Sequence, residues 1–314
     1  MIKIALVGIG KIAIDQHVPA IAASTDWDLG ATVSRNGSID GVPSYKNLDD
    51  MLAENPDIRV VSLCMPPVPR FDYAAKALAA GRHVMLEKPP GATLSECHAL
   101  HAMAETNRVS LYGTWHSREA AQVAAAKAWL QDKQLKRLQV IWKEDVRRWH
   151  PGQDWIFDPG GMGVFDPGIN ALSIVTDIVQ DRMHITNATL EVPENRQTPI
   201  AAALQFHHPK GADVSVELDW RQDGDQIWTI EAETDQGTVQ LLDGGARMMI
   251  DGIETDAEED TLAGEYPRLY AKMAQLVTDG GTDLDLAPMV HVADALALGR
   301  RISVAPFYFE SGKD

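Results

Sequence analysis

The sequence is poor in cysteine, and its two cysteines do not suggest a pair. Cys64 and Cys97 are the only cysteines among 314 residues. They have neither the spacing of metal ligands nor the density of a disulfide scaffold. We therefore expect no metal site, no disulfide framework and a reducing compartment.

Long apolar runs and an excess of basic residues are also lacking. No segment approaches the roughly 18 apolar residues that span a bilayer, and the first residues show no cationic and apolar leader. Lys and Arg number 28 against 45 Asp and Glu, a formal net charge of −17, and such a surface repels polyanions. These absences predict a cytoplasmic protein that binds neither nucleic acid nor membranes.

The length predicts two domains, at about 150 residues each, and the first covers residues 1–117. Short apolar runs alternate there with helical patterns, which is typical of a parallel sheet with helical crossovers. The expected strands are Ile2–Val7, Leu29–Ser34, Val60–Met65, Val84–Glu87 and Val109–Tyr112. The expected helices are Lys11–Ala23, Asn47–Glu54, Arg70–Ala80 and Ser95–Asn107.

Residues 118–314 predict a second domain of α+β type. Strands that follow one another with short polar turns favour a large, mostly antiparallel sheet with one free face. They are Arg137–Val146, Ala201–His207, Asp213–Trp220, Gln226–Thr234 and Thr238–Leu242. The expected helices are Ala120–Gln131, Asp166–Ile178, Tyr266–Thr278 and Pro288–Arg300, and the acidic run Asp256–Asp260 predicts a solvated loop. The overall fold class is thus α/β, with an N-terminal Rossmann domain and a C-terminal α+β domain.

A glycine motif follows the first expected strand. Gly8-Ile9-Gly10-Lys11-Ile12-Ala13 has the G-x-G-x-x-A pattern and opens the first helix. The first Gly permits a tight turn, the second lets a pyrophosphate approach, and the small third residue allows close packing. We therefore predict a dinucleotide site that includes Gly8, Gly10, Lys11 and Ile12, although a purely structural glycine turn has the same pattern.

The end of the second strand indicates which dinucleotide binds. A carboxylate that holds the ribose of NAD should stand there, and Asp28 stands at the strand's beginning instead. Ser34-Arg35-Asn36 supplies a hydroxyl and a guanidinium, which suit a 2′-phosphate. The sequence favours NADP with NAD possible, and Arg35 as an ordinary surface residue is the alternative.

The fourth strand ends in Glu87-Lys88-Pro89-Pro90. Ligands in open α/β sheets bind at the carboxyl ends of strands, so Lys88 is expected near the nicotinamide. Partial burial beside a cationic ring disfavours a charged amine, which suits a general base. A surface ion pair is the ordinary alternative, but Pro89 restricts the backbone of Lys88. At the ends of the third and fourth strands, Cys64, Pro66 and Glu87 are further cofactor candidates.

These motifs resemble the glucose–fructose oxidoreductase, inositol dehydrogenase and MocA (Gfo/Idh/MocA) family, and within it the bacterial aldose 1-dehydrogenases that act on L-arabinose and D-galactose. The resemblance covers essentially the whole chain. It is carried by Gly8–Gln16 with His17, Met85–Leu94, Trp142–Gln153 and Gly163–Thr176. It implies NAD(P)-dependent oxidation of an aldopyranose at C1 to the lactone, with a small-molecule sugar as the substrate.

Two helix residues add a candidate catalytic pair to Lys88. Asp166 and Asn170 stand at i and i+4, so one helix face presents both. Many members of the wider family have His at the second position, which can transfer a proton, whereas Asn170 can only orient the sugar. Either Lys88 or Asp166 is then the base, and we favour Lys88. A helix N-cap ahead of Pro167 is the structural alternative for Asp166.

The block Trp142–Gln153 predicts a sugar-binding surface. Glu144, Arg147, Trp149 and His150 bring together donors, acceptors and an aromatic face, as polyol recognition requires. By resemblance, Glu144 and His150 contact the sugar. Strand alternation places Glu144 on an otherwise apolar face, although a salt bridge to Arg147 would also explain it. His116, after the fifth strand, is a further pocket candidate.

Two other functions have to be weighed against this one. An inositol or glucose oxidoreductase should have His where this chain has Asn170. A nucleotide-binding sensor without catalysis has no need for Lys88 as a proton acceptor. The free sheet face is also a candidate surface for homo-oligomer formation, as in relatives that pair through this domain.

Overall fold

The computed structural model describes residues 1–256 and 264–309, and the chain divides into two compact units. The first contains residues 1–119 and 264–286, and the second contains residues 120–256 and 287–309. The segment 264–286, grouped with the second domain in the sequence analysis, therefore lies in the first unit. Of the acidic run Asp256–Asp260, only Asp256 lies among the described residues.

The first unit contains a fully parallel six-stranded sheet in the order β3-β2-β1-β4-β5-β6. This is the order of a Rossmann sheet, and it confirms the predicted fold. The strands are β1 Ile2–Val7, β2 Trp27–Val33, β3 Ser44–Tyr45, β4 Val60–Leu63, β5 His83–Leu86 and β6 Leu111–Gly113. The helices are α1 Val18–Ala23, α2 Leu48–Glu54, α3 Pro67–Ala79, α4 Leu94–Asn107 and α8 Glu265–Asp279, with short helical turns at Ala13–His17 and His116–Glu119.

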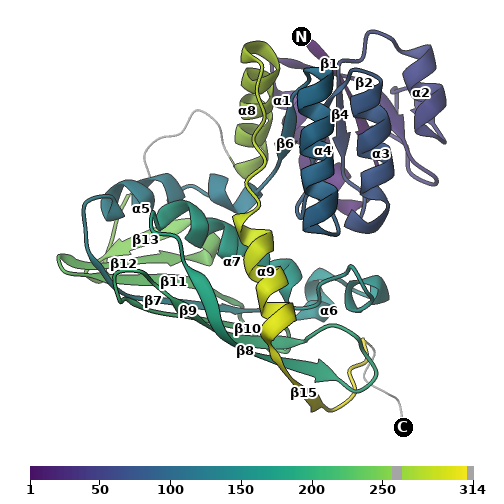
Figure 1. Ribbon diagram of the computed structural model, residues 1–314. Helices are drawn as coiled ribbons and strands as arrows, with labels where there is room; N and C mark the ends of the chain where they lie inside the picture. The colour runs from purple at the N-terminus through teal and green to yellow at the C-terminus, as the bar shows by residue number, and fades with distance from the viewer. Residues whose placement is uncertain (257–263, 310–314) are drawn as a thin grey trace. The chain divides into compact units, whose positions relative to one another are not determined.

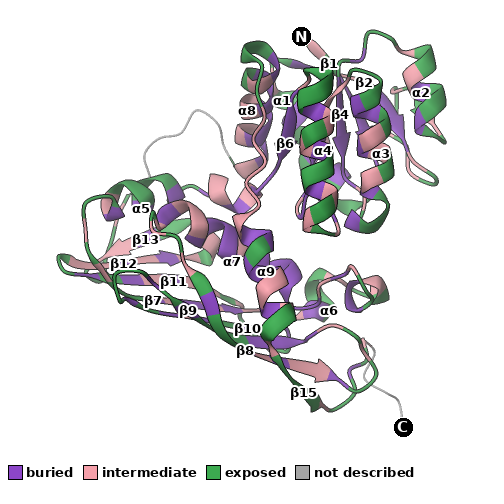
Figure 2. Ribbon diagram, viewed as in Figure 1, coloured by how far each residue is buried: buried purple, intermediate pink, exposed green. Residues whose placement is uncertain are grey.

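Both faces of this sheet are buried, which explains why its strands are apolar runs (Figure 2). Ile4 and Leu6 of β1 pack with α1 and α8, whereas Ala5 and Val7 pack with α2, α3 and α4. Helix α8 is fixed to this core by Leu269, Tyr270 and Met273, all fully buried. The sequence pattern predicts α8 correctly as a helix, but it does not indicate which sheet the helix covers.

The second unit contains a nine-stranded sheet in the order β14-β13-β12-β11-β7-β10-β9-β8-β15 (Figure 1). Its pairs are antiparallel except β10 with β7 and β15 with β8. The strands are β7 Leu135–Lys143, β8 His184–Pro193, β9 Ala201–His207, β10 Asp213–Asp219, β11 Ile227–Thr234, β12 Gly237–Leu242, β13 Arg247–Ile250, β14 Ile253–Glu254 and β15 Arg300–Val304. The α+β prediction with a large, mostly antiparallel sheet is confirmed.

Helices cover one face of this sheet and leave the other open (Figure 1). They are α5 Val123–Leu130, α7 Phe165–Ile178 and α9 Ala287–Leu298, and shorter turns lie at α6 Val146–Trp149, Asp154–Phe157 and Asp243–Gly245. Along β9 the residues alternate between buried and exposed, as expected for a sheet covered on one side. Helix α7 approaches β10 closely, because a Cβ at Gly168 would lie 2.4 Å from Leu218.

Several predicted boundaries are wrong. The strand predicted over Arg137–Val146 ends at Lys143, because Asp145 caps the helical turn α6. The helix predicted over Pro288–Arg300 ends at Leu298, and Arg300 begins β15. The helix predicted over Lys11–Ala23 contains a π-helical turn at Ala13–His17 before α1. Among the described residues, no helix is both long and apolar enough to cross a membrane.

Candidate active site

The glycine motif forms a turn that suits a dinucleotide. Gly8 has φ +90°, and a Cβ there would lie 2.8 Å from the backbone nitrogen of Met65, so only glycine fits. A Cβ at Gly10 would meet nothing within 4 Å, so the space in front of this residue is open to a ligand. Ala13 is fully buried in the core, while Lys11 and Ile12 are exposed. The residues present therefore fit the pyrophosphate of a dinucleotide.

Ser34 and Arg35 directly follow β2, at the same edge of the sheet as the glycine motif that follows β1. Ser34 follows the last residue of β2, and its Oγ accepts the N–H of Gly37 at 3.1 Å. Arg35 is exposed, and its carbonyl accepts from Lys46 at 2.9 Å. Asp28 is the second residue of β2, at the far end of the strand. No carboxylate follows β2 directly, as the sequence analysis expected.

The other cofactor candidates differ in exposure. Pro66 is the exposed N-cap of α3, and Cys64 is buried in the core. The Glu87 carboxylate faces the protein interior, where its Oε1 accepts from Tyr266 at 2.6 Å and from His17 at 3.1 Å. The side chain of Glu87 is thus used within the protein.

Lys88 is half-buried and stands two residues after the end of β5. Its backbone N–H donates to Oε2 of Glu87 at 2.8 Å, and the peptide bond to Pro89 is cis. The buried guanidinium of Arg70 donates to the carbonyls of Glu87 and Pro89. The backbone on both sides of Lys88 is therefore fixed by side-chain hydrogen bonds.

His116 lies in the first unit, in the turn after β6. Its Nδ1 is 2.7 Å from Oε2 of Glu265, and its ring stacks on Tyr266 at 5.8 Å. These contacts hold the imidazole in one orientation.

In the second unit, Glu144, His150 and Asp166 form a polar cluster. His150 Nε2 lies 3.2 Å from Oδ2 of Asp166. The His150 ring also lies 5.6 Å from the ring of Trp220, whose Nε1 donates to Glu144 at 3.1 Å. Three sequence-predicted residues are thus brought together from the strand end, the following turn and helix α7.

Two indoles hold the Glu144 carboxylate. Oε1 accepts from Trp220 at 3.1 Å and Oε2 accepts from Trp228 at 2.8 Å. Burial raises the pKa of Glu144, and the hydrogen bonds from the two indoles oppose that shift. Neither tryptophan was predicted as part of the site. The pairing of the strands points to Trp228: it lies on β11 opposite Trp142 of β7, and Trp142 stands two residues before Glu144.

Asp166 does not cap helix α7. The helix begins at Phe165 with Val164 as its N-cap, and Asp166 lies within the first turn, so the N-cap alternative is wrong. A carboxylate in the first turn is stabilised by the helix dipole. Asn170, one turn later, is partly exposed, and within the described ranges no hydrogen bond to its side-chain amide occurs. This amide is therefore available to a ligand.

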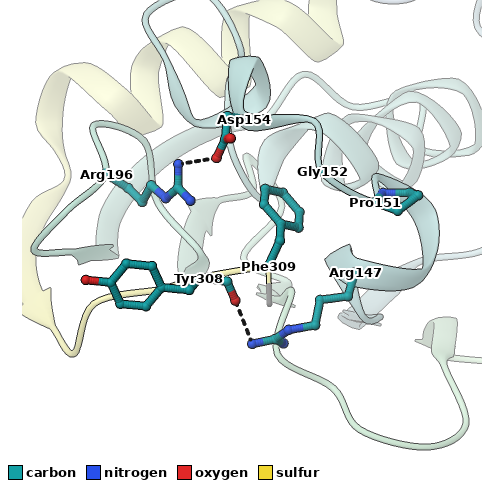
Figure 3. Close-up of a pocket in the computed structure, with 7 residues that line it drawn as sticks. All are labelled: Arg147, Pro151, Gly152, Asp154, Arg196, Tyr308 and Phe309. Carbon is teal, nitrogen blue, oxygen red and sulfur yellow. Dashed lines mark hydrogen bonds and ion pairs between the residues drawn. The ribbon is translucent and has the colours of Figure 1, made fainter. Parts of the chain in front are cut away.

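Arg147 and Trp149 lie on the turn between Glu144 and His150 but point to different surroundings. Arg147 interacts with Asp145 at 3.7 Å and donates to the Tyr308 carbonyl at 3.1 Å, so the alternative of a Glu144–Arg147 salt bridge is wrong. Arg147 lines a cavity of about 720 Å³ together with Arg196, Asp154 and Phe309 (Figure 3). Trp149 is 39% exposed and lies 5.5 Å from Trp228, so it offers an aromatic face beside Glu144.

Comparison with known proteins gives a family match to the first unit and a relative that spans nearly the whole chain. Residues 2–113 match the family model described as "Oxidoreductase family, NAD-binding Rossmann fold". The chain is 43% identical over 308 residues to a galactose 1-dehydrogenase from Pseudomonas fluorescens. The alignment covers 98% of this chain and 99% of that protein. The chain belongs to the Gfo/Idh/MocA oxidoreductase family. The family resemblance predicted from the sequence is therefore confirmed.

Solved structures agree with this assignment. The crystal structure of a D-galactose-1-dehydrogenase protein from Rhizobium etli is 53% identical, with a TM-score of 0.93 and 98% of each chain covered. KijD10, a 3-ketoreductase from Actinomadura kijaniata solved with TDP-benzene and NADP, has a TM-score of 0.80 at 16% identity and covers 96% of this chain and 99% of its own. The second similarity shows the fold alone. The chain itself is therefore an oxidoreductase with a nicotinamide dinucleotide as its cofactor.

Proposed function

We propose that this protein oxidises an aldopyranose of the D-galactose and L-arabinose type at C1 and releases the aldonolactone. The observation that carries the proposal is the full-length identity of 43% and 53% to two proteins named as galactose 1-dehydrogenases. The cluster of Glu144, His150 and Asp166 supports it, because closely spaced acceptors and donors suit the hydroxyl groups of a sugar.

We assign Lys88 as the general base and Asp166 as the residue that binds the anomeric hydroxyl of the sugar. Lys88 follows β5 at the carboxyl edge of the Rossmann sheet, where its backbone is fixed. Asp166 is a buried acceptor that His150 orients. When bound, the oxidised nicotinamide would supply the acceptor for the hydride at C1 of the sugar. Proton removal by a positioned side chain contributes about 10²- to 10⁴-fold to such a rate.

The remaining candidates recognise the sugar. Asn170 orients a hydroxyl through its available amide, and it cannot act as the proton-transferring histidine of many relatives. Glu144 and His150 bind further hydroxyls, while Trp149 packs against the apolar face of the ring. His116 and Arg147 remain further candidates for the sugar pocket.

NADP is the proposed preferred cofactor, with NAD also accepted. Support comes from the end of β2, where Ser34 and the exposed Arg35 stand in place of a carboxylate. A guanidinium can bind the 2′-phosphate through two hydrogen bonds, whereas the 2′-hydroxyl of NAD lacks that charge.

The open face of the nine-stranded sheet is proposed to mediate self-association. A shallow hollow on this sheet is lined by residues of β7, β8, β9 and β10, among them Gln139, Thr189, Ala203 and Ser215. These four side chains are uncharged, and Glu217, which also lines the hollow, pairs with Lys143 at 2.5 Å, so the surface suits a flat partner such as a second copy of this sheet.

A substrate panel tests the proposed activity. Purified protein is mixed with NADP or NAD and with L-arabinose, D-galactose, D-fucose, D-glucose, D-xylose or myo-inositol, and reduced nicotinamide is measured by its absorbance. We expect turnover with the first three sugars, because L-arabinose, D-galactose and D-fucose share their configuration at C2, C3 and C4. Turnover with myo-inositol alone, or cofactor binding without any turnover, would contradict the proposal.

A further inference from the structure

A buried polar cluster lies behind Lys88, and the proposed reaction leaves it without a role. Its members are His17, Glu87, Tyr266 and Tyr270, and none is more than 5% exposed. They come from the π-helical turn, the residue after β5, and helix α8. Burying so many polar groups costs free energy unless each finds a partner, so the contacts within the cluster need an explanation.

The hydrogen bonds between the four side chains run to Glu87 either directly or through His17. Oε1 of Glu87 accepts from the Tyr266 hydroxyl at 2.6 Å and from His17 Nε2 at 3.1 Å. The other ring nitrogen of His17 lies 2.7 Å from the Tyr270 hydroxyl. Because both oxygens of a carboxylate move together, these groups also fix Oε2, which accepts the backbone N–H of Lys88 at 2.8 Å.

The backbone around Lys88 is therefore held at three points by buried side chains. Glu87 holds the N–H of Lys88, and Arg70 holds the carbonyls of Glu87 and Pro89. The direction in which a side chain leaves the chain follows from its backbone conformation. The direction in which the Lys88 side chain leaves the backbone thus depends on the buried groups that bind this backbone.

The π-helical turn explains how His17 reaches Glu87. It covers Ala13–His17, directly after the glycine motif, and Val18 N–H bonds to the Ala13 carbonyl. One extra residue in a turn rotates the following side chains relative to a regular α-helix, and such turns are frequent at functional sites. His17 is fully buried here, whereas its neighbour Gln16 is exposed.

We propose that His17, Tyr266 and Tyr270 are positioning residues, which fix the Glu87 carboxylate and through it the backbone and direction of Lys88. The inference rests on the proposed function, since it assigns these residues to the proton acceptor of that reaction. It also connects α8, far along the chain, to the end of β5.

Tyr266→Phe tests the proposal, because it removes the hydroxyl and keeps the ring. Tyr112→Phe is the matched control: Tyr112 is a buried tyrosine of the same core, and within the described part of the chain its hydroxyl makes no hydrogen bond to Glu87. We expect kcat of Tyr266→Phe to fall about tenfold, since small misplacements of a reacting group are costly. KM for the sugar and Kd for NADP should stay within about twofold of the unmodified protein, and Tyr112→Phe should keep all three values.

A second pair of variants tests His17 and guards against a folding defect. The amide of His17→Gln can still donate to Glu87, whereas His17→Leu cannot. We expect the glutamine variant to retain at least about fivefold more kcat than the leucine variant at equal KM. Equal kcat in these two variants, or in Tyr266→Phe and Tyr112→Phe, would overturn the proposal.

A readout independent of turnover separates this inference from the proposed function. Lysines are reductively methylated with 13C-formaldehyde, and the Lys88 resonance is assigned with Lys88→Arg. The resonance should move in Tyr266→Phe and stay in place in Tyr112→Phe, even if no sugar in the panel is oxidised. A resonance that is identical in all three proteins contradicts the positioning role, whereas an inactive protein with a shifted resonance contradicts only the proposed reaction.

Discussion

At the residue scale, the two candidate proton acceptors lie in very different surroundings. Lys88 lies half-buried on a backbone held by Glu87 and Arg70. Asp166 is buried in the first turn of α7 and paired with His150. The difference makes separate substitutions informative, because each removes one proposed role and leaves the other residue in place.

Lys88→Met and Asp166→Ala should each lower kcat by about 10²- to 10⁴-fold, since each removes a group placed to accept or orient the proton. The Kd for NADP, measured by quenching of protein fluorescence, should change little. A variant that loses turnover and keeps cofactor binding supports catalysis over a sensor role. Unchanged kcat in Lys88→Met would show that Lys88 is not the base.

Arg35→Ala should raise the KM for NADP about tenfold or more and leave the KM for NAD nearly unchanged. The reason is that a guanidinium contributes to binding of a 2′-phosphate through charge-assisted hydrogen bonds. Initial rates with both cofactors at saturating sugar measure the difference. Equal effects on the two KM values would contradict the assignment of Arg35.

Glu87→Gln tests the buried ion pair by its pH dependence. Burial alone would raise the pKa of Glu87, but the hydrogen bond and charge of His17 outweigh burial and lower the pKa well below its ordinary value of 4.5. A carboxyl whose pKa is lower in the folded than in the unfolded protein stabilises the fold at pH values above its unfolded pKa. This contribution to the free energy of unfolding is lost as the pH falls. The variant should be about 3 kcal/mol less stable at pH 7.

The difference in unfolding free energy between the unmodified protein and Glu87→Gln should narrow by about 1.4 kcal/mol per pH unit below roughly pH 4.5. Urea unfolding of both proteins from pH 7 to pH 3 measures it, and the other carboxyls cancel because both proteins contain them. A gap that stays constant with pH would show that Glu87 is not held as the anion.

At the element scale, the glycines before α7 determine where Asp166 stands. Gly163 has φ +56°, and a Cβ there would lie 2.3 Å from the Pro199 carbonyl oxygen. Its own carbonyl accepts the N–H of Asp166 at 2.8 Å. The start of α7, and with it the position of Asp166, therefore depends on a residue without a side chain.

Gly163→Ala should lower the free energy of unfolding by roughly 2 to 4 kcal/mol, because it adds a backbone clash to a strained φ. Gly152→Ala is the matched control, since Gly152 has φ +66° and a Cβ there would meet nothing within 4 Å. It should cost only about 1 kcal/mol. Equal losses of stability, measured by urea unfolding, would contradict the close approach to Pro199.

The elements that could be predicted from the sequence are those whose pattern reflects complete burial or strict alternation. Strands such as Ile2–Val7 are apolar because both faces of the sheet are covered. Strand β8 was missed because its register shifts between Ile185 and Asn187, which interrupts the alternation. Strand β15 was missed because it is an edge strand with mostly exposed residues.

The candidate site was predictable to a different degree. Local motifs identify Gly8, Lys88 and Asp166, because each stands at a defined place relative to a strand or helix. The partners that hold them come from distant segments, as Trp220 and Trp228 do for Glu144, and Tyr266 for Glu87. Such pairs depend on tertiary packing, which a single sequence does not contain. The assigned roles of the site residues stay predictions.

At the scale of the whole molecule, a net charge of −17 acts against any self-association. An interface between copies therefore has to lie where charge is sparse, as in the hollow around Gln139, Ala203 and Ser215. Glu217 also lines this hollow, where its charge is paired with Lys143 at 2.5 Å.

Ala203→Arg should convert an associated form to monomers, because it places a charge on the open sheet face. Ala125→Arg, at an exposed position of α5, is the control and should leave the mass unchanged. Light scattering after size-exclusion chromatography measures both. A monomeric unmodified protein, or equal behaviour of the two variants, would contradict association through this sheet.

The return of α8 to the first sheet has a consequence for biosynthesis. A ribosome that has made residues 1–119 has not yet made the helix that covers Ile4 and Leu6 and completes the bonds of Glu87. At about 5 to 20 residues per second, roughly ten to thirty seconds pass before that helix emerges. During this interval the part of that sheet face which α1 does not cover stays apolar and exposed, so it is the surface where a chaperone would be expected to bind.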